Sequence, residues 1–330
     1  MDKKKYILVT GGCGFIGSNF INKLIDHKKN VIILDNLSSG SKKNLALLKK
    51  KSNQRNSNLI FFKKNLCKKN EIYKIFEKFH IDYIFHFAAF SSVHESIKNP
   101  KKIMNNNILS TKNLIYCLKK FNVENLIFSS SASVYGNAVT NKGIKESNKL
   151  KPINPYGKSK LTCEQIILKE LKKKMFKFCI LRYFNVVGKN LSKSFEKKKN
   201  LNLFEKISYC LKKNKIFSIH GKNLQTLDGT PVRDFISMSD LIAAHMECFK
   251  QKNNLKFWNK IYNVGINKGF SVLQVITNYN TLFKNKIRFN FIDKKIGEID
   301  QSVANNKKFI RNSNWSPKDK TIKKLLNSFF

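Results

Sequence analysis

The stretch INPYGKSK, residues 153–160, places Tyr156 four residues before Lys160. Four residues are about one helical turn, so the two side chains would lie on the same face of a helix. Tyrosine has an ordinary pKa near 10 and is a poor base at neutral pH. An ammonium about 4 Å away contributes roughly 4 kcal/mol at an effective dielectric of about 20, or about 3 pKa units. We therefore expect Lys160 to bring a Tyr156 phenolate into working range, although the pair alone also fits two unrelated surface side chains.

A run of hydroxyl groups ends an expected strand in FSSSASVYG, residues 128–136. Ser131 is placed to donate a hydrogen bond to a substrate oxygen beside Tyr156. The same run also fits capping of a strand end. The predicted catalytic residues are Ser131, Tyr156 and Lys160.

A glycine-rich loop, TGGCGFIGS, follows the first apolar run and has glycines at Gly11, Gly14 and Gly17. Glycines permit a tight turn and close approach of backbone N–H groups to a pyrophosphate, and a following helix adds partial positive charge. Asp35 ends the next expected strand, where a carboxylate can accept hydrogen bonds from an adenosine ribose. No arginine follows Asp35, and its charge repels a 2′-phosphate, so the pattern favours NAD over NADP. A purely structural glycine turn is the alternative.

These residues must be positioned by short apolar runs that alternate with helical patterns through the first half of the chain. Strands that are apolar throughout and separated by helices indicate a parallel sheet covered on both faces, a Rossmann-type doubly wound α/β fold. A further strand is expected within 178–188, running into a loop. The other expected strands are residues 6–10, 31–35, 59–62, 83–89 and 126–131, and the expected helices are 16–28, 68–79, 100–121 and 155–173.

The second half of the chain is less regular. We expect helices over 201–213, 237–250 and 271–280, strands over 217–221 and 261–265, and a mobile loop over the Lys/Ser/Asn-rich residues 189–200. The predicted domains are an NAD-binding domain, residues 1–186, and a smaller, mainly substrate-binding domain, residues 187–330. Parts of 235–280 are expected to rejoin the first domain.

The composition is strongly basic, with a formal net charge of +43 from 64 lysines and arginines. Arginine is the residue that nucleic-acid sites use most, but only five of the basic residues are arginines and the lysines are spread along the whole chain. We therefore expect solvated surfaces and no nucleic-acid partner.

Seven widely spaced cysteines without a C-x-x-C pair predict reduced thiols, no zinc or other metal site, and a cytoplasmic protein. The first apolar run is short and leads into glycines, which indicates a strand rather than a signal peptide. No run approaches the ~18 apolar residues of a membrane span, so no membrane association is expected.

Several motifs occur in the order found in one known family. They are TGGCGFIGS, DNLSSG (35–40), HFAA (86–89), SSSASVYG, NPYGKSK, LRYFNVVG and DGTPVRDFI (228–236). The chain resembles the extended short-chain dehydrogenases/reductases, the NAD-dependent epimerase/dehydratase family, and over nearly its whole length is most similar to the UDP-glucose 4-epimerases. Related dehydratases have an Asp-Glu pair after the catalytic hydroxyl, whereas this chain has Ala132 and Ser133. The resemblance therefore favours epimerisation over loss of water.

This resemblance implies that NAD stays bound while UDP-glucose and UDP-galactose interconvert. Tyr156 would take the proton of the sugar 4-hydroxyl as C4 gives hydride to NAD⁺, with Ser131 bonding the same oxygen and Lys160 tuning Tyr156. The 4-ketose would then turn over and receive hydride on its opposite face. A homodimer through helices 100–121 and 155–173 is also implied. The implied cofactor positions are Gly11, Gly14, Phe15, Ile16, Gly17, Asp35, Asn36, Ser39, Gly40, Asn65, Leu66, Phe87, Ala88, Asn106, Tyr156, Lys160 and Tyr183.

The implied substrate positions are Ser91, Ser131, Tyr156, Asn185, His220, Arg233, Lys295, Glu298 and Ser302. Arg233 suits a forked contact with a diphosphate, with a structural ion pair to Asp234 as the alternative. His220 stands where the family has an aromatic residue that packs on uracil, with a plain surface-loop residue as the alternative.

Other positions depart from the family's pattern. Asn65 stands where an aspartate is usual near the adenine, which implies weaker but retained cofactor binding. Residues 295–298, which include Lys295 and Glu298, replace an R-x-G-D segment, and lysine lacks the bidentate fork of arginine. A small residue at Ser302 implies that N-acetylated UDP-sugars are also accepted.

Two further hypotheses remain from the sequence. One is another NAD-dependent nucleotide-sugar epimerase that acts on a different sugar. The other is a non-catalytic protein that binds nucleic acid through its charge, in which case the catalytic residues would be expected to be missing. Their presence at positions 131, 156 and 160 favours an enzyme.

Overall fold

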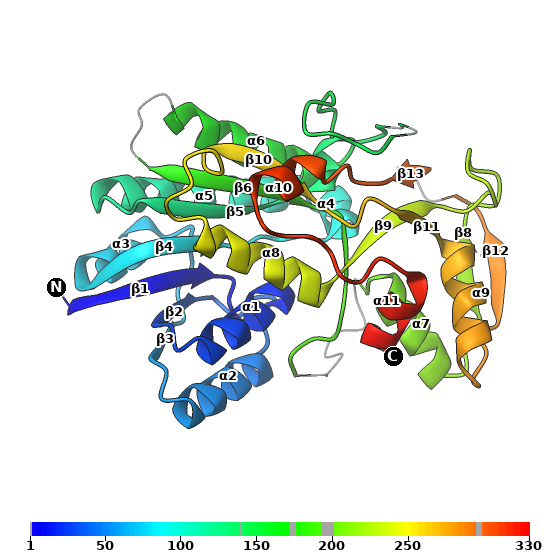
Figure 1. The fold of residues 1–330 in the computed structure, drawn as a ribbon, viewed down its shortest axis with the longest axis horizontal. Coiled ribbons are helices and arrows are strands. Elements are labelled where there is room, and N and C mark those ends of the chain that lie inside the picture. Colours follow the sequence, from blue (N-terminus) through cyan, green and yellow to red (C-terminus); the bar gives the residue numbers. More distant parts are fainter. Residues whose placement is uncertain (1, 139, 141, 172–175, 193–200, 295–298) are drawn as a thin grey trace.

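A seven-stranded parallel sheet forms the centre of the larger half of the molecule (Figure 1). The computed structural model describes residues 2–138, 140, 142–171, 176–192, 201–294 and 299–330. The strand order is β10-β6-β5-β4-β1-β2-β3, and every neighbouring pair is parallel. The strands are β1 (Asp2–Thr10), β2 (Val31–Leu34), β3 (Leu59–Phe62), β4 (Phe79–His86), β5 (Asn125–Ser131), β6 (Lys177–Tyr183) and β10 (Lys260–Val264). This arrangement confirms the predicted doubly wound parallel sheet.

Helices cover both faces of this sheet because its strands are apolar on both sides. In β1, Ile7 and Val9 point into one core cluster, whereas Tyr6 and Leu8 point into the other, as the alternation of side chains along a strand requires. The first cluster includes side chains of α1 (Phe15–Asp26), α2 (Lys42–Gln54) and α8 (Met238–Lys250). The second includes side chains of α3 (Lys69–Lys78), α5 (Pro100–Lys120) and α6 (Pro155–Leu171).

The chain reverses direction across the sheet between β1 and β4. It runs outward from β1 through β2 to β3 and then returns to the other side of β1 with β4. The loops that leave the carboxyl ends of β1 and β4 diverge at this point, which is where open α/β sheets form ligand sites. The glycine loop follows β1 and the HFAA segment spans the end of β4, so both lie at this edge.

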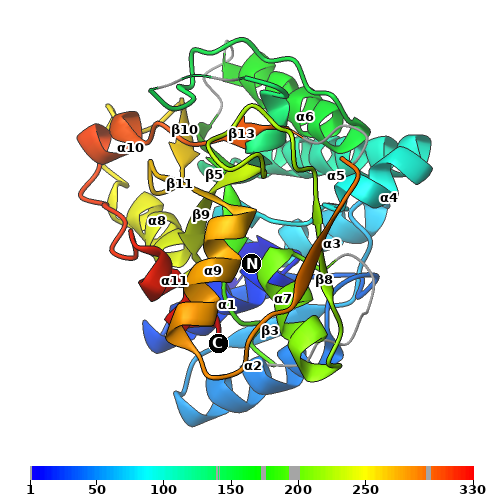
Figure 2. The same ribbon diagram turned by 90° about the vertical axis from the view of Figure 1, so that its right-hand side faces the viewer.

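The remaining elements form a smaller layer, which faces the viewer in Figure 2. Strand β9 (Val232–Ser237) pairs with β7 (Asn185–Val187), β11 (Gly269–Ser271) and β13 (Gln301–Ser302). Strands β8 (Phe217–His220) and β12 (Phe289–Ile292) form a two-stranded ribbon. The helices α7 (Leu203–Lys212), α9 (Val272–Leu282) and α11 (Ile322–Phe329) lie on this side. The short helices α4 (Val93–Lys98) and α10 (Lys307–Asn312) complete the fold.

The expected elements are present, and their bounds differ from the predicted ones by no more than four residues. The strand expected over 178–188 is interrupted at Phe184, so that β6 belongs to the large sheet and β7 to the small one. Most of the loop expected over 189–200 lies outside the described residues, as does the predicted end of the helix over 155–173. The division into two domains stays a prediction, although α8 and β10 do lie against or within the large sheet.

Candidate active site

A cavity opens at the carboxyl edge of the large sheet, between the glycine loop, the end of β2 and the first turns of α6. It is lined by Ser91 and by every predicted cofactor residue except Gly40. The lining residues that the sequence did not single out include Lys64, Ser110 and Ser129. Ser129 belongs to the same serine run as Ser131 and could have been inferred from it, whereas the sequence around Lys64 carries no such signal.

The glycine loop leaves room for a ligand because side chains cannot be added to it. Gly11 has φ +68°, and a Cβ there would lie 2.7 Å from the Ala88 nitrogen. Gly14 precedes the first residue of α1 and has no side chain to cover the helix end. Gly17 packs so closely that a Cβ would collide with the Gly11 carbonyl oxygen. The open N-terminus of α1 faces the cavity, and this cradle fits a diphosphate.

Asp35 lies at the end of β2 and its carboxylate is held from behind by two backbone amides. Oδ2 accepts from the Cys13 nitrogen at 2.9 Å and Oδ1 from the Leu37 nitrogen at 2.8 Å. Burial raises the pKa of this carboxyl, and the two amide hydrogen bonds act in the opposite direction. Gly40 lies behind it, since a Cβ there would be 2.9 Å from Oδ1. Gly40 therefore shapes the carboxylate pocket rather than the cavity wall, and Asp35 is fixed where it fits the hydroxyls of a ribose.

Asn65 lines the same cavity, and its side chain accepts a hydrogen bond from the chain itself. Its Oδ1 accepts from the Cys67 nitrogen at 3.0 Å. A side-chain amide retains a second lone pair and two donors. The residue can therefore still contact a ligand, as the sequence predicts.

Tyr156 and Lys160 enter the cavity from the first two turns of α6. The Asn154 side chain accepts from the Gly157 nitrogen at 2.8 Å, so the helix starts at Pro155 as expected for an Asn N-cap followed by proline. The Lys160 Nζ donates to the Ser129 carbonyl at 2.6 Å. Its ammonium is buried, and burial lowers its pKa to about 8.

The expected effect of Lys160 on Tyr156 is wrong for the protein without ligands. Burial raises the pKa of Tyr156 to about 12, with a hydrogen bond involving Ser131 acting in the opposite direction and the nearby Cys163 adding to the rise. The expectation assumed a 4 Å ion pair set by helical spacing alone. Instead the Lys160 ammonium is held by the Ser129 carbonyl, and burial opposes charge on both side chains.

Ser131 ends β5 beside Tyr156, although it is not among the residues that line the cavity. Its hydroxyl accepts a hydrogen bond from the Ser133 nitrogen at 3.2 Å. A side-chain hydrogen bond between Ser131 and Tyr156 acts to lower the pKa of the Tyr156 hydroxyl. The next residues, Ala132–Val134, form a single 3-10 turn. No carboxyl is present in that turn, where a dehydratase would have its Asp-Glu pair.

A second cavity lies in the smaller layer and contains three of the predicted substrate residues. Asn185, His220 and Arg233 line it together with side chains of α7. His220 ends strand β8 and contributes to the wall, so it is not merely a surface-loop residue. Lys295 and Glu298 lie outside the described residues.

The alternative ion pair between Arg233 and Asp234 is not favoured by the structure. Adjacent residues of a strand point to opposite faces, and the fully buried Asp234 carboxylate accepts from the backbone nitrogens of Ile266, Asn267 and Ala304. Arg233 Nη1 donates to its neighbour's carbonyl, Val232 O, at 2.9 Å. Ser302 is paired with Arg233 across β13 and β9 and is buried.

Among the described residues, no group of three or more His, Cys, Asp or Glu side chains is placed to hold a metal ion. In the same part of the chain, no helix is both long enough and apolar enough to cross a membrane.

Comparison with known proteins shows similarity along the whole chain. The model of the GDP-mannose 4,6 dehydratase family matches residues 8–328. The UDP-glucose 4-epimerase of Dictyostelium discoideum is 34% identical over 314 residues, which are 94% of this chain and 90% of that protein. The bifunctional protein GAL10 of Kluyveromyces lactis is 35% identical, and the match covers 92% of this chain but only 44% of that protein.

Solved structures show the same similarity. The UDP-glucose-4-epimerase from Stenotrophomonas maltophila, with bound NAD and formylated UDP-arabinopyranose, is 26% identical with a TM-score of 0.90, covering 98% of this chain and 96% of that one. The UDP-Glc/GlcNAc 4-epimerase from Campylobacter jejuni is 32% identical with a TM-score of 0.82, covering 98% and 97%. These matches include the segments that line both cavities.

Proposed function

Since the chain belongs to the NAD-dependent epimerase and dehydratase family of nucleotide-sugar enzymes, and within it to the UDP-glucose 4-epimerases, we propose that it interconverts UDP-galactose and UDP-glucose by inverting C4 of the sugar. The observation that supports this most is that Tyr156 and Lys160 line the same cavity as the glycine loop and Asp35. A base, its neighbouring cation and a dinucleotide cradle therefore share one site.

NAD is the cofactor of this enzyme, and the cavity fits it. The open N-terminus of α1 would hold the pyrophosphate, Asp35 the adenosine ribose, and Asn65 the adenine. Lys160 would hold the nicotinamide ribose. When bound, NAD supplies a hydride acceptor that later returns the hydride to the sugar, together with a positively charged ring.

Tyr156 is the proposed base for the sugar 4-hydroxyl. It would take that proton during oxidation and return it during reduction, so the sugar passes through a 4-keto form. Ser131 would donate a hydrogen bond to the same oxygen and fix its position. In the protein alone, burial keeps Tyr156 protonated, so its ionisation must be promoted by positive charge that enters the cavity.

The second cavity is the proposed site of the UDP group. Arg233 and Asn185 would contact the diphosphate, and His220 would stack on the uracil. Lys295 and Glu298 remain predicted contacts. A sugar held by its diphosphate could turn over between the two hydride transfers, which explains inversion at a single carbon.

The chemistry of residues 131–136 favours epimerisation over dehydration, although the matching family model is described by a dehydratase. Elimination of water needs a proton donor for the leaving hydroxyl. Ala132 and Ser133 cannot provide a carboxylic acid at that place.

Product identity separates this proposal from another epimerase of the same family. Purified protein is incubated with UDP-galactose, and the nucleotide-sugar products are separated by chromatography. We expect UDP-glucose to accumulate. Recovery of unchanged UDP-galactose, with turnover of a different nucleotide sugar, would favour the alternative epimerase.

We further propose that N-acetylated UDP-sugars are accepted. Ser302 is small and is paired with Arg233 across β13 and β9, but it lines neither cavity. The support for this proposal is the family resemblance at that position, together with the similarity to the UDP-Glc/GlcNAc 4-epimerase from Campylobacter jejuni. Incubation with UDP-GlcNAc should yield UDP-GalNAc, and Ser302→Tyr should abolish this product while conversion of UDP-galactose continues. Absence of UDP-GalNAc with the wild-type enzyme would refute the broader specificity.

A homodimer through α5 and α6 is also proposed. These helices pack against each other, and α5 exposes Leu109 and Tyr116. Sedimentation should give twice the 38.3 kDa chain mass. A monomer at micromolar concentration would count against this interface.

A further inference from the structure

The last three residues of β5 are each joined to a different side chain of α6. The Ser129 carbonyl accepts from the Lys160 ammonium, and the Ser130 hydroxyl donates to Glu164 Oε1. Ser131 shares a side-chain hydrogen bond with Tyr156. The three helix positions are four residues apart, so they form one face of α6. They are Tyr156, Lys160 and Glu164. The proposed catalytic side chains Tyr156 and Lys160 therefore project from the same face of α6 as Glu164.

Of these three contacts, the one between Ser130 and Glu164 lies away from the cavity. Ser130 and Glu164 do not line it, and both are buried, at 2% and 0% exposure. Glu164 Oε1 also accepts from Arg182 Nε at 3.0 Å, and Oε2 accepts from Arg182 Nη2 at 2.6 Å. This is a bidentate Arg–carboxylate pair, which fixes orientation as well as distance.

Arg182 is itself fixed to the sheet. It is the direct partner of Ser130 across β5 and β6, so both point to the face that α6 covers. Its Nη1 donates to the Tyr135 hydroxyl at 2.8 Å, and that hydroxyl donates to Asn263 Oδ1 at 2.7 Å. The network therefore joins α6 to β5, β6 and β10 through buried, satisfied polar groups.

We propose that Ser130, Glu164 and Arg182 act as a positioning clamp, which sets the rotation and height of α6 on the sheet and thereby places the Tyr156 hydroxyl beside Ser131. None of the three touches the cavity. Their effect on the reaction is transmitted by two rigid helical turns. A shift of α6 by a fraction of an ångström would separate the base from the serine that shares its oxygen, and such misplacement is costly in rate.

The inference rests on the proposed function for its kinetic readout, so a second readout that needs no substrate accompanies it. The test variant is Ser130→Ala, which removes one hydrogen bond and leaves the Arg182–Glu164 pair intact. The second variant, Glu164→Gln, keeps an oxygen acceptor but removes the charge. The matched control is Ser52→Ala, because the Ser52 hydroxyl is buried and donates to the Ser57 carbonyl at 2.6 Å, far from the site.

Each variant is assayed for kcat and KM with UDP-galactose, for NAD content and for melting temperature. The ionisation of Tyr156 is followed separately by tyrosinate absorbance in the cofactor-free protein, with the same variant carrying Tyr156→Phe subtracted. Ser130→Ala should lower kcat about tenfold, as expected for misplaced catalytic groups, with KM and NAD content unchanged, and should move the Tyr156 titration. Glu164→Gln should lower kcat at least as much.

Ser52→Ala should lose comparable stability but keep the wild-type kcat and titration. A folded Ser130→Ala enzyme whose kcat and Tyr156 titration both equal those of the wild type would contradict the proposed clamp, whatever its melting temperature. If Glu164→Gln fails to fold, Ser130→Ala decides alone. If the wild type itself does not convert UDP-galactose, the proposed function fails, and the Tyr156 titration still tests the clamp.

Discussion

At the scale of single residues, burial sets the protonation of the two central side chains. Tyr156 and Lys160 are 9% and 3% exposed. Burial disfavours the charged form of each side chain, so it raises the pKa of Tyr156 to about 12 and lowers the pKa of Lys160 to about 8. At neutral pH, Tyr156 therefore keeps its proton, whereas Lys160 still carries its positive charge. This is a property of the folded cavity, and under the proposed function the positively charged nicotinamide ring of the cofactor would promote ionisation of the base.

The lowered pKa of Lys160 predicts a stability change with pH. The folded pKa lies below its ordinary value of 10.5, so the unfolded chain binds more protons between about pH 8 and 10.5 and stability from this residue rises across that window. The difference corresponds to about 3 kcal/mol at most. In urea unfolding of cofactor-free protein, the wild type should therefore gain stability relative to Lys160→Met as the pH is raised from about 8 to 10.

The control for that comparison is Lys158→Met, because Lys158 is exposed on the same helix. Its stability relative to wild type should stay constant over the same pH range. A constant difference for Lys160→Met as well would show that the Lys160 ammonium is not desolvated.

The sequence predicted the residues of the site better than their electrostatic state. Tyr156, Lys160 and Ser131 could be singled out because their spacing and strand-end position are local properties, and Tyr156 and Lys160 do line the cavity. The pKa of Tyr156 was predicted in the wrong direction, since residue spacing contains neither burial nor the partner of the ammonium. Glu164 was missed because its role depends on Arg182, which is 18 residues away in the chain.

At the scale of elements, the glycine loop shows two separate uses of a missing side chain. A Cβ at Gly17 would collide with the loop itself, whereas a Cβ at Gly14 would approach only the Gly11 oxygen, at 3.2 Å. Gly17 is thus required for packing of α1 against the loop. Gly14 mainly keeps the helix end open.

Two alanine variants should separate these uses. Gly17→Ala should reduce both the melting temperature and the NAD content, because the loop must move. Gly14→Ala should leave the melting temperature of cofactor-free protein within a few degrees of wild type and still reduce NAD retention at least tenfold, since a methyl group would occupy the diphosphate cradle. Equal NAD content in Gly14→Ala and wild type would exclude the α1 N-terminus as the diphosphate site.

Elements were predictable from the sequence where their residues form a continuous apolar run. Strand β2 is buried at every position, and its apolar run predicts it directly. Helix α2 buries little apolar surface, with only Leu45 and Leu48 as its buried apolar residues, so its lysine-rich sequence has a weak pattern. Strand β9 was missed because Arg233 and Asp234 interrupt its apolar run.

At the scale of the whole molecule, the large sheet and the smaller layer are joined by a buried carboxylate. Asp234 of β9 accepts from Ile266 and Asn267, which follow β10, and from Ala304, which follows β13. Three segments distant in the sequence therefore meet at one side chain. This contact could not be predicted, since it requires the placement of all three.

Asp234→Asn should destabilise the protein by about 2–4 kcal/mol, because an amide N–H₂ would face buried backbone donors. The measurement is urea unfolding at neutral pH. Asp26→Asn makes the same chemical change at a partly exposed pair with Lys51 and should cost less than about 1 kcal/mol. Similar losses in the two variants would show that Asp234 does not join the layers.

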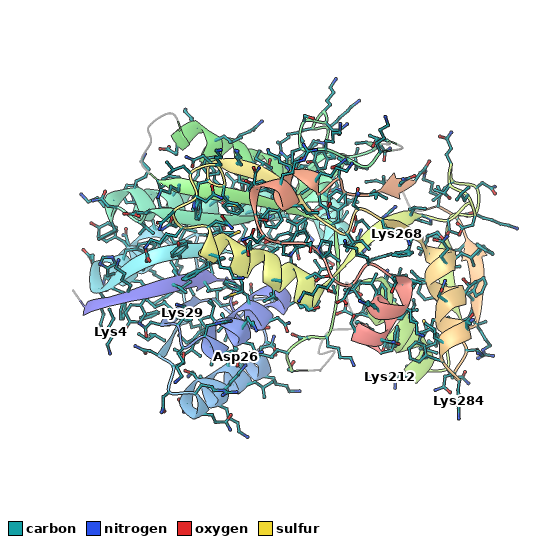
Figure 3. All side chains as sticks on the ribbon, in the orientation of Figure 1. Lys4, Asp26, Lys29, Lys212, Lys268 and Lys284 are labelled. Atoms are coloured by element: carbon teal, nitrogen blue, oxygen red, sulfur yellow. The ribbon has the colours of Figure 1, made fainter. Side chains whose placement is uncertain are left out.

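The basic charge is also a whole-molecule property. Among the labelled lysines, Lys4 and Lys29 lie in the left half of the view and Lys212, Lys268 and Lys284 in the right half (Figure 3). This spread agrees with solvated surfaces rather than one basic face. A nucleic-acid site would require a concentrated patch.

The most direct test of the account is conversion of UDP-galactose to UDP-glucose without added NAD, measured for the wild type beside Tyr156→Phe. Tyr73→Phe, a change of the same kind on α3, serves as the control. The account predicts turnover by the wild type and by Tyr73→Phe, and a loss of about 10²–10⁴ in kcat for Tyr156→Phe. Equal activity of Tyr156→Phe and the wild type would contradict the assignment of Tyr156 as the base.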